Sequence, residues 1–205
     1  DRLLSNAGVN PWGLLSGWVP WVVGDRTEVV VAMDWTDFDD DDHTTICLYL
    51  LTNHGRATPL VWLTMEKSGL KGNRSDAEDM VLLRLREVLP STVTKVLVLA
   101  DRGFGDVGLY ALLLEWKWDF VIRFRGCIGV TTTGGEQKKA EEWLRPDGRA
   151  LRLKDVGVTD EKLLLPAVVL DFVEAGGPLL RGRARGELAR RDESAREHGV
   201  GGGRG

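Results

Sequence analysis

The feature that most constrains the fold of this chain is a run of β-branched apolar residues that ends near a single acid. Val29, Val30 and Val31 open the run, and Asp34 follows near its end. β-Branched side chains are stiff and pack well on a pleated sheet, so the run predicts a buried strand over 28–35. A buried carboxylate is unfavourable unless it is paired or binds a metal ion, which makes Asp34 a candidate site residue.

A second stretch has the same design. Residues 95–100 are mostly Val and Leu, which predicts a strand, and Asp101 follows directly. Two apolar strands that each deliver one aspartate are the main chemical feature of the sequence. Two carboxylates of this kind suit Mg²⁺ or Mn²⁺, and paired ions ~3.5–4 Å apart serve phosphoryl transfer on nucleic acids. The alternative is that each aspartate caps a strand end or pairs with a neighbour such as Arg102.

The remaining pattern predicts the order β-β-β-α-β-α-β. Short turns between the first three strands favour antiparallel pairing, and Pro59 predicts a bulge or an edge position. Ser75 and Glu78 are expected to cap the first helix reciprocally. The expected ranges are strands 28–35, 44–52 and 57–65, a helix over 76–89, a strand at 95–100, a helix over 105–116 and a strand at 119–125.

This order is that of an α/β, ribonuclease-H-like core with a mixed sheet. In that fold the first and fourth strands are neighbours, so Asp34 and Asp101 are expected to meet at one sheet edge. Three regions are expected: residues 1–126 form the core, with an irregular or short-helical lead-in packed on the first strand; residues 127–175 form a β-rich insertion; and residues 176–205 form a disordered tail rich in Arg and Gly. Within the insertion, strands are expected at 128–133, 150–153 and 163–169.

The formal net charge of −4 excludes a globally basic surface for nucleic acid, so any such contact must be local. Arg102, Arg123 and Arg125 are the candidates. Arg123 and Arg125 alternate with apolar residues and should share one face of their strand, as phosphate contacts or as a solvated edge. Two cysteines and the lack of a signal peptide or of a ~20-residue apolar run point to the cytoplasm.

Two further stretches partly match known binding motifs, a calcium loop and a dinucleotide-binding turn. The acidic run 37–42 lacks the Gly and Glu of a calcium loop in the required register and predicts a hairpin turn instead. Residues 103–108 match the Gly-x-Gly-x-x-Gly pattern of dinucleotide binding. Asp101 would repel a pyrophosphate there, and arginines replace the ribose-binding acid, so helix packing is the alternative explanation for these glycines.

Four segments carry a resemblance to a known family. The segments are Asp34-Trp35-Thr36, His54-Gly55-Arg56-Ala57-Thr58-Pro59-Leu60, Ala100-Asp101-Arg102-Gly103-Phe104 and Ile122-Arg123-Phe124-Arg125-Gly126. With these segments the chain resembles the bacterial insertion-sequence transposases of the DDE class, in the insertion-sequence-four-like group, from about Asp1 to Val169.

The resemblance implies a ribonuclease-H-like core, Mg²⁺ on an Asp-Asp-Glu set, and DNA transposition by strand transfer. It makes Asp34 and Asp101 the first two acids and implies insertion-sequence ends and target DNA as partners, a homodimer in the full-length protein, and association with the bacterial nucleoid. The family's third acid follows the insertion in a Tyr-x-x-Arg-x-x-x-Glu setting, which this sequence lacks. The late candidates are Glu187, Glu193 and Glu197.

The expected protein is therefore an incomplete and inactive transposase core, truncated at both ends, with a truncation or a frameshift as the explanation for its C-terminal part. A non-catalytic DNA-binding remnant and a dinucleotide-binding protein are the alternatives.

Overall fold

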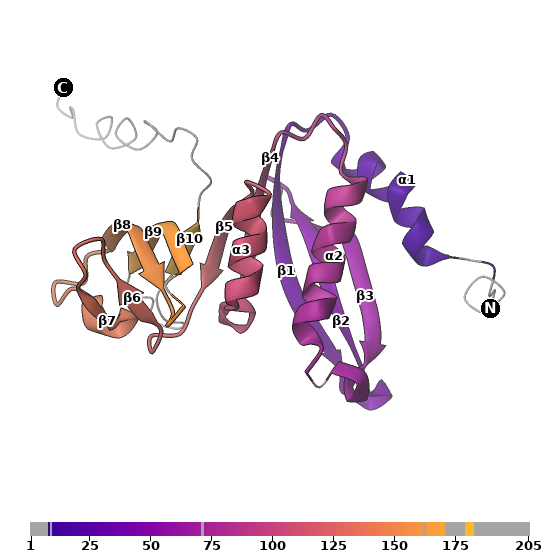
Figure 1. Ribbon diagram of the computed structural model, residues 1–205. Coiled ribbons are helices and arrows are strands. Elements are labelled where there is room, and N and C mark those ends of the chain that lie inside the picture. Colours follow the sequence, from indigo (N-terminus) through magenta and orange to yellow (C-terminus); the bar gives the residue numbers. More distant parts are fainter. Residues whose placement is uncertain (1–7, 9, 71, 162, 171–178, 183–205) are drawn as a thin grey trace, which may run out of the picture.

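The valine run forms strand β1 (Glu28–Phe38), the middle strand of a mixed five-strand sheet (Figure 1). The computed structural model describes residue 8 and residues 10–70, 72–161, 163–170 and 179–182. Within these residues the strand order is β3-β2-β1-β4-β5, and the sheet continues as β10-β9-β8-β6-β7. Val29, Val31 and Met33 are buried, so one face of β1 packs in the core.

The first three strands form the expected antiparallel meander. Strand β1 pairs with β2 (His43–Leu51), which pairs with β3 (Ala57–Glu66). The register of β2 against β3 shifts between Leu48 and Tyr49, and Leu60 is the unmatched residue beside Pro59. Pro59 thus lies at a bulge on the terminal strand of the sheet, as its missing N–H predicts.

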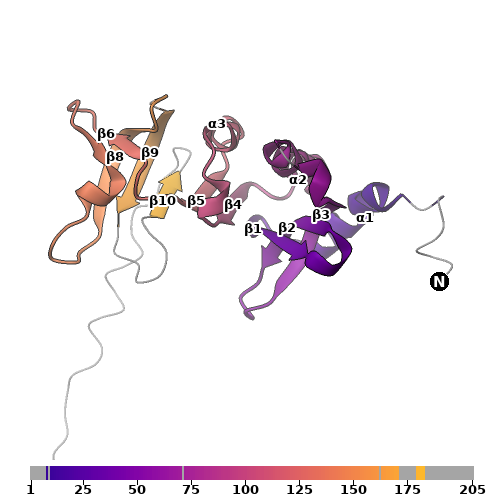
Figure 2. The same cartoon turned by 90° about the horizontal axis from the view of Figure 1, so that it is seen from below.

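Two βα units complete the five-strand part, in the predicted order. Strand β4 (Lys95–Ala100) lies parallel to β1, and β5 (Asp119–Arg123) lies parallel to β4. Helices α2 (Arg74–Val88) and α3 (Val107–Glu115) connect these strands and cover the same face of the sheet (Figure 2). Right-handed crossovers in one direction along a sheet place their helices on one side.

The N-terminal segment is a helix, the second of the two predicted options, but it does not pack mainly on the first strand. Helix α1 (Pro11–Val23) has Asn10 as its N-cap and packs against β3 and α2. Its buried side chains, Leu15, Val19 and Val23, recur every four residues. Gly13, Gly17 and Pro20 weaken the helical propensity of this segment, so tertiary packing decides its structure.

The C-terminal part is antiparallel and β-rich. Its strands are β6 (Gly129–Thr131), β7 (Gln137–Lys139), β8 (Leu151–Val158), β9 (Leu163–Leu170) and β10 (Leu179–Gly182). Four 3-10 turns occur in the described chain: η1 (Asp39–Asp41), η2 (Lys67–Leu70), η3 (Arg102–Phe104) and η4 (Ala140–Trp143). The acidic run 37–42 is split between the end of β1 and the η1 turn of a hairpin, as expected.

Strand β10 corrects the prediction of disorder from residue 176. Leu179–Gly182 lies between β5 and β9 and pairs antiparallel with both. Without it, both neighbours would present unpaired backbone groups at sheet edges, which favours adding a short strand there. The rest of the predicted tail, residues 183–205, lies outside the described residues, as do 171–178.

Candidate functional site

The carboxyl ends of β1 and β4 bring Asp34 and Asp101 to the same edge of the sheet. The two strands are parallel, and their last matched pair is Met33 with Ala100. Asp34 and Asp101 come next, so they occupy adjacent positions in the following row. This adjacency confirms the expectation from the predicted strand order. Strand β1 runs three residues further than predicted, to Phe38, and Asp34 lies within it, opposite Cys47 of β2.

Asp34 lies on the sheet face that α2 and α3 leave uncovered. Successive side chains of a strand point to opposite faces. Met33 and Trp35 face the helices, because Trp35 donates a hydrogen bond to Glu78 of α2, so Asp34 faces away from them. Asp34 is exposed and forms no hydrogen bond or ion pair with any residue that the structure describes. Its carboxylate is available to a ligand.

Asp101 is held by the turn that follows β4. It has extended backbone angles and is the N-cap of η3, where its Oδ1 accepts a hydrogen bond of 2.7 Å from the Gly103 N–H. This bond fixes the orientation of an otherwise exposed side chain. The backbone of the Asp-Arg-Gly-Phe segment therefore positions the second carboxylate beside the first strand.

Arg123 continues the same row on the third parallel strand. Ala100 pairs with Ile122, so the next position aligns Asp101 with Arg123, the last residue of β5. Asp34, Asp101 and Arg123 thus form a row of two acids and one base across β1, β4 and β5. Arg125 lies two residues further on and is exposed, beyond the end of the strand. The predicted strand over 119–125 ends two residues early, but buried Ile122 and Phe124 keep both arginines on the opposite side from the core.

Arg102 occupies a different place. It is exposed within η3, directly after Asp101, and forms no ion pair with Asp34 or Asp101 in the described part of the chain. The alternative in which each aspartate is neutralised by a neighbouring arginine therefore finds no support in the side-chain contacts.

Cys47 and Tyr49 of β2 border Asp34 on the uncovered face. Burial is the main cause that raises the pKa of Cys47 to about 11; a hydrogen bond with Tyr49 opposes this, and the charge of Asp34 adds to it. Burial likewise raises the pKa of Tyr49. At neutral pH the thiol is protonated, so Cys47 is no nucleophile in this site.

The helix-covered face holds Glu78, a buried carboxylate whose role differs from the predicted one. Glu78 was expected to cap α2 with Ser75, but the helix begins at Arg74 after Asn73 and has no side-chain cap. Glu78 is only 5% exposed, and its Oε1 accepts a 2.8 Å hydrogen bond from Trp35 Nε1. Arg74 lies 3.7 Å from Glu78 and stacks over Trp35 at 4.7 Å. Burial raises the pKa of Glu78, while Trp35 and Arg74 lower it.

A pattern in the sequence could have found this role. Glu78 occupies a position of the inward stripe that Val81, Leu82 and Leu85 otherwise fill. A lone acid within such a stripe needs a buried partner. The indole of Trp35, next to Asp34, is a suitable donor at the end of the strand that the helix covers.

The glycines at 103–108 serve packing and capping in this structure. Asp106 is the N-cap of α3 and accepts a 3.2 Å hydrogen bond from the Gly108 N–H, as Asp101 does from Gly103. Two carboxylates thus occupy N–H groups that a phosphate would need. A Cβ at Gly105 would lie 3.3 Å from the Tyr110 hydroxyl, which explains the glycine there.

The described residues contain no cluster of three or more His, Cys, Asp or Glu side chains able to hold a metal ion. Asp34 and Asp101 come directly after the last matched pair of β1 and β4, and the late candidates Glu187, Glu193 and Glu197 lie outside the described residues. The donor chemistry of the two aspartates fits Mg²⁺ or Mn²⁺, since both are hard carboxylate oxygens with no ion pair among the described residues. Within the described part of the chain, no helix combines the length and the apolar character that spanning a membrane requires.

Comparisons with known proteins add little. No protein-family model and no curated protein matches the sequence. Among solved structures, the chain is similar to a crystal structure of Marinitoga piezophila Argonaute in complex with 5′ OH guide RNA, at 10% identity and a TM-score of 0.27. The match covers 85% of this chain and 28% of that one. A likeness of this strength supports no argument about fold or function.

Proposed function

We propose that this chain is the core of a DDE-class transposase of a bacterial insertion sequence, with a ribonuclease-H-like fold. The observation that carries the proposal is the row of Asp34, Asp101 and Arg123 on three adjacent strands. The strand order β3-β2-β1-β4-β5, with only β2 reversed, is the order of that fold, and the two acids fall where the sequence resemblance expects them. DNA, a nucleoid-associated location in the cytoplasm and a homodimer of the full-length protein belong to the same proposal.

Asp34 and Asp101 are the residues that would hold Mg²⁺ or Mn²⁺. Divalent ions bound there would activate the attacking oxygen and stabilise the leaving oxygen at a DNA phosphate. The chain itself would contribute by positioning these carboxylates and one guanidinium. The Gly103 N–H orients Asp101, strand pairing holds Asp34 beside it, and Arg123 at the end of the row offers a guanidinium to a phosphate oxygen.

Exposed Arg102 and Arg125 extend the positive charge around this row. They suit contacts with the DNA backbone, which supply affinity without sequence information. The electrostatic attraction is local, because the chain as a whole carries a net charge of −4.

We further propose that this chain cleaves DNA poorly, since only two of the three expected acids are identified. A two-metal site with one carboxylate missing binds its ions less tightly and orients them less well. The absence of a three-residue acidic cluster among the described residues also keeps open the second candidate function, a DNA-binding remnant without catalysis.

Cleavage and binding assays separate the candidates. The 205-residue chain is incubated with DNA carrying the element's own ends, in Mg²⁺ and in Mn²⁺, with Asp34→Ala and Asp101→Ala as controls. The expected result is salt-sensitive DNA binding with at most weak cleavage that both substitutions abolish. Robust cleavage lost in both variants would mean that another acid of this chain completes the site. A chain that neither binds nor cleaves this DNA would contradict the proposal.

A further inference from the structure

The outward face of α2 carries apolar side chains that the core does not use. Its inward residues Val81, Leu82 and Leu85 are fully buried. Met80 and Leu83 lie on the other side of the helix, with 48% and 52% of their surface exposed. Asp76, Met80, Leu83 and Glu87 follow one another at intervals of four, three and four, so they form one straight stripe along the helix.

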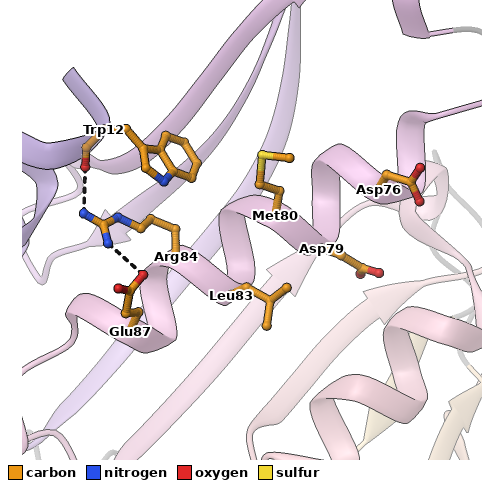
Figure 3. A pocket seen from close by; sticks show the side chains of 7 residues that line it. All are labelled: Trp12, Asp76, Asp79, Met80, Leu83, Arg84 and Glu87. Atoms are coloured by element: carbon orange, nitrogen blue, oxygen red, sulfur yellow. Dashed lines mark hydrogen bonds and ion pairs between the residues drawn. The ribbon is translucent and has the colours of Figure 1, made fainter. Parts of the chain in front are cut away.

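Trp12 of α1 bounds this stripe on one side and turns it into an open groove of about 570 Å³ (Figure 3). Arg84 fixes the position of that wall. Its Nη2 donates a 2.7 Å hydrogen bond to the Trp12 carbonyl, and its Nη1 pairs with Glu87 at 2.7 Å. The groove therefore has an apolar floor and a wall tied to α2 by hydrogen bonds.

The rim of the groove is acidic. Three carboxylates, Asp76, Asp79 and Glu87, face one guanidinium, and that guanidinium already pairs with Glu87. In the described part of the chain, Asp76 and Asp79 form no ion pair. Burial, with the charges of Asp106 and Asp76, raises the pKa of Asp79. This surface therefore carries more negative than positive charge.

We infer that this groove binds a basic amphipathic helix of a protein partner. Bulky apolar side chains one turn apart would fill the space between Trp12, Met80 and Leu83, as in other helix-in-groove contacts. Lys or Arg side chains flanking them would pair with Asp76 and Asp79. The inference is independent of the proposed function, because this surface lies on α2 and α1, on the opposite side of the sheet from Asp34.

Other occupants fit less well. A small molecule would stay largely in solvent, because the floor residues are about half exposed. Nucleic acid would be repelled by the carboxylates. A second copy of this chain, meeting the groove about a two-fold axis, would bring the same acidic rim against itself.

The test uses the full 205-residue chain and two synthetic helical peptides. Both present Leu and Phe at positions i, i+4 and i+7, and the flanking positions are Arg in one peptide and Glu in the other. Fluorescence anisotropy of labelled peptides measures the dissociation constants. We expect the Arg peptide to bind at least tenfold more tightly than the Glu peptide, and 0.5 M salt to weaken its binding several-fold.

Variants locate the binding surface. Met80→Asp with Leu83→Asp should weaken binding of the Arg peptide at least tenfold, and Asp76→Asn with Asp79→Asn about three- to fivefold. Leu164→Asp is the matched control, since Leu164 is an exposed apolar residue of β9 far from the groove, and it should leave binding unchanged. Circular dichroism confirms that each variant is folded. Equal binding of both peptides, equal loss in Leu164→Asp, or a dimer of the chain that Met80→Asp dissolves would overturn the inference.

Discussion

Acidic side chains on the two faces of the sheet have opposite environments. On the helix-covered face, Glu78 is buried and hydrogen-bonded to Trp35, with Arg74 near both. On the uncovered face, one residue away along β1, Asp34 is exposed and has no hydrogen bond or ion pair within the described residues. A satisfied buried carboxylate stabilises the fold, whereas an exposed and unpartnered one is available for binding. Glu78 therefore serves the fold, and Asp34 is the acid on which the proposed function rests.

The largest expected effect on stability is at Glu78. Glu78→Ala leaves the indole N–H of Trp35 without an acceptor, which should lower the free energy of unfolding by about 1–3 kcal/mol. Glu78→Gln keeps an acceptor at the same place and should lose less. Urea denaturation followed by tryptophan fluorescence measures both. Equal losses in the two variants would mean that the hydrogen bond to Trp35 is unimportant.

The two cysteine thiols should differ strongly in reactivity, which is the next largest effect. Cys47 lies buried beside Asp34 with its pKa raised to about 11, whereas Cys127 is exposed. Because the thiolate is the reactive form, Cys47 should react with Ellman's reagent at pH 8 at least ~100-fold more slowly than an ordinary exposed thiol. Cys127→Ser should remove the fast phase. A fast phase that survives this substitution would place Cys47 in a more open environment than described.

The pH dependence of stability isolates the charge of Glu78. Its pKa is raised in the folded chain, so the folded state holds this proton more tightly than the unfolded state does. The resulting stabilisation is present at pH values below the ordinary pKa of 4.5 and is lost as the pH rises through the folded-state pKa. Relative to Glu78→Gln, the wild-type Tm should therefore fall as the pH rises from below 4.5 through the raised pKa of Glu78. A difference in Tm that is constant with pH would contradict this.

The smallest expected effect on stability is at the candidate site itself. Asp34→Asn and Asp101→Asn remove exposed charges that form no ion pair with any described residue, so unfolding free energies should change by less than about 0.5 kcal/mol. Asp101→Asn keeps an oxygen for the Gly103 N–H. A loss of several kcal/mol in Asp34→Asn would show that this acid is structural, like Glu78, and would remove the contrast between the two faces.

The dinucleotide alternative has its own test. Because Asp101 and Asp106 occupy N–H groups of the glycine-rich turn, NADPH and NADH should produce no shift in Tm. Saturable binding at micromolar concentration that Gly105→Val abolishes would contradict this prediction.

The five-strand part of the fold could be predicted because its local patterns agree with its tertiary structure. Runs such as 95–100 have the same preference alone and in the sheet, and the strand order then places Asp34 beside Asp101. The sequence left helix α1 open between a short helix and an irregular segment, because its glycines and Pro20 disfavour a helix that packing imposes. Strand β10 was missed because pairing with β5 and β9, rather than its composition, makes it a strand.

The candidate site was predictable in its acids and only partly in its surroundings. Arg123 was expected to share a face with Arg125, but its alignment with Asp101 depends on the register between β4 and β5, which no local pattern encodes. The role of Glu78 was missed because a capping pattern and an inward stripe coincide at one residue, and only the position of Trp35 decides between them.

Binding of Mn²⁺ tests the central claim most directly, namely that Asp34 and Asp101 form one ligand-binding pair. Titrations of the chain followed by electron paramagnetic resonance compare the wild type with Asp34→Asn, Asp101→Asn and, as a control acid in the exposed turn, Asp40→Asn. We expect each of the first two substitutions to weaken Mn²⁺ binding about tenfold or more, and Asp40→Asn to leave it unchanged. Wild-type binding in Asp34→Asn and Asp101→Asn would contradict the account.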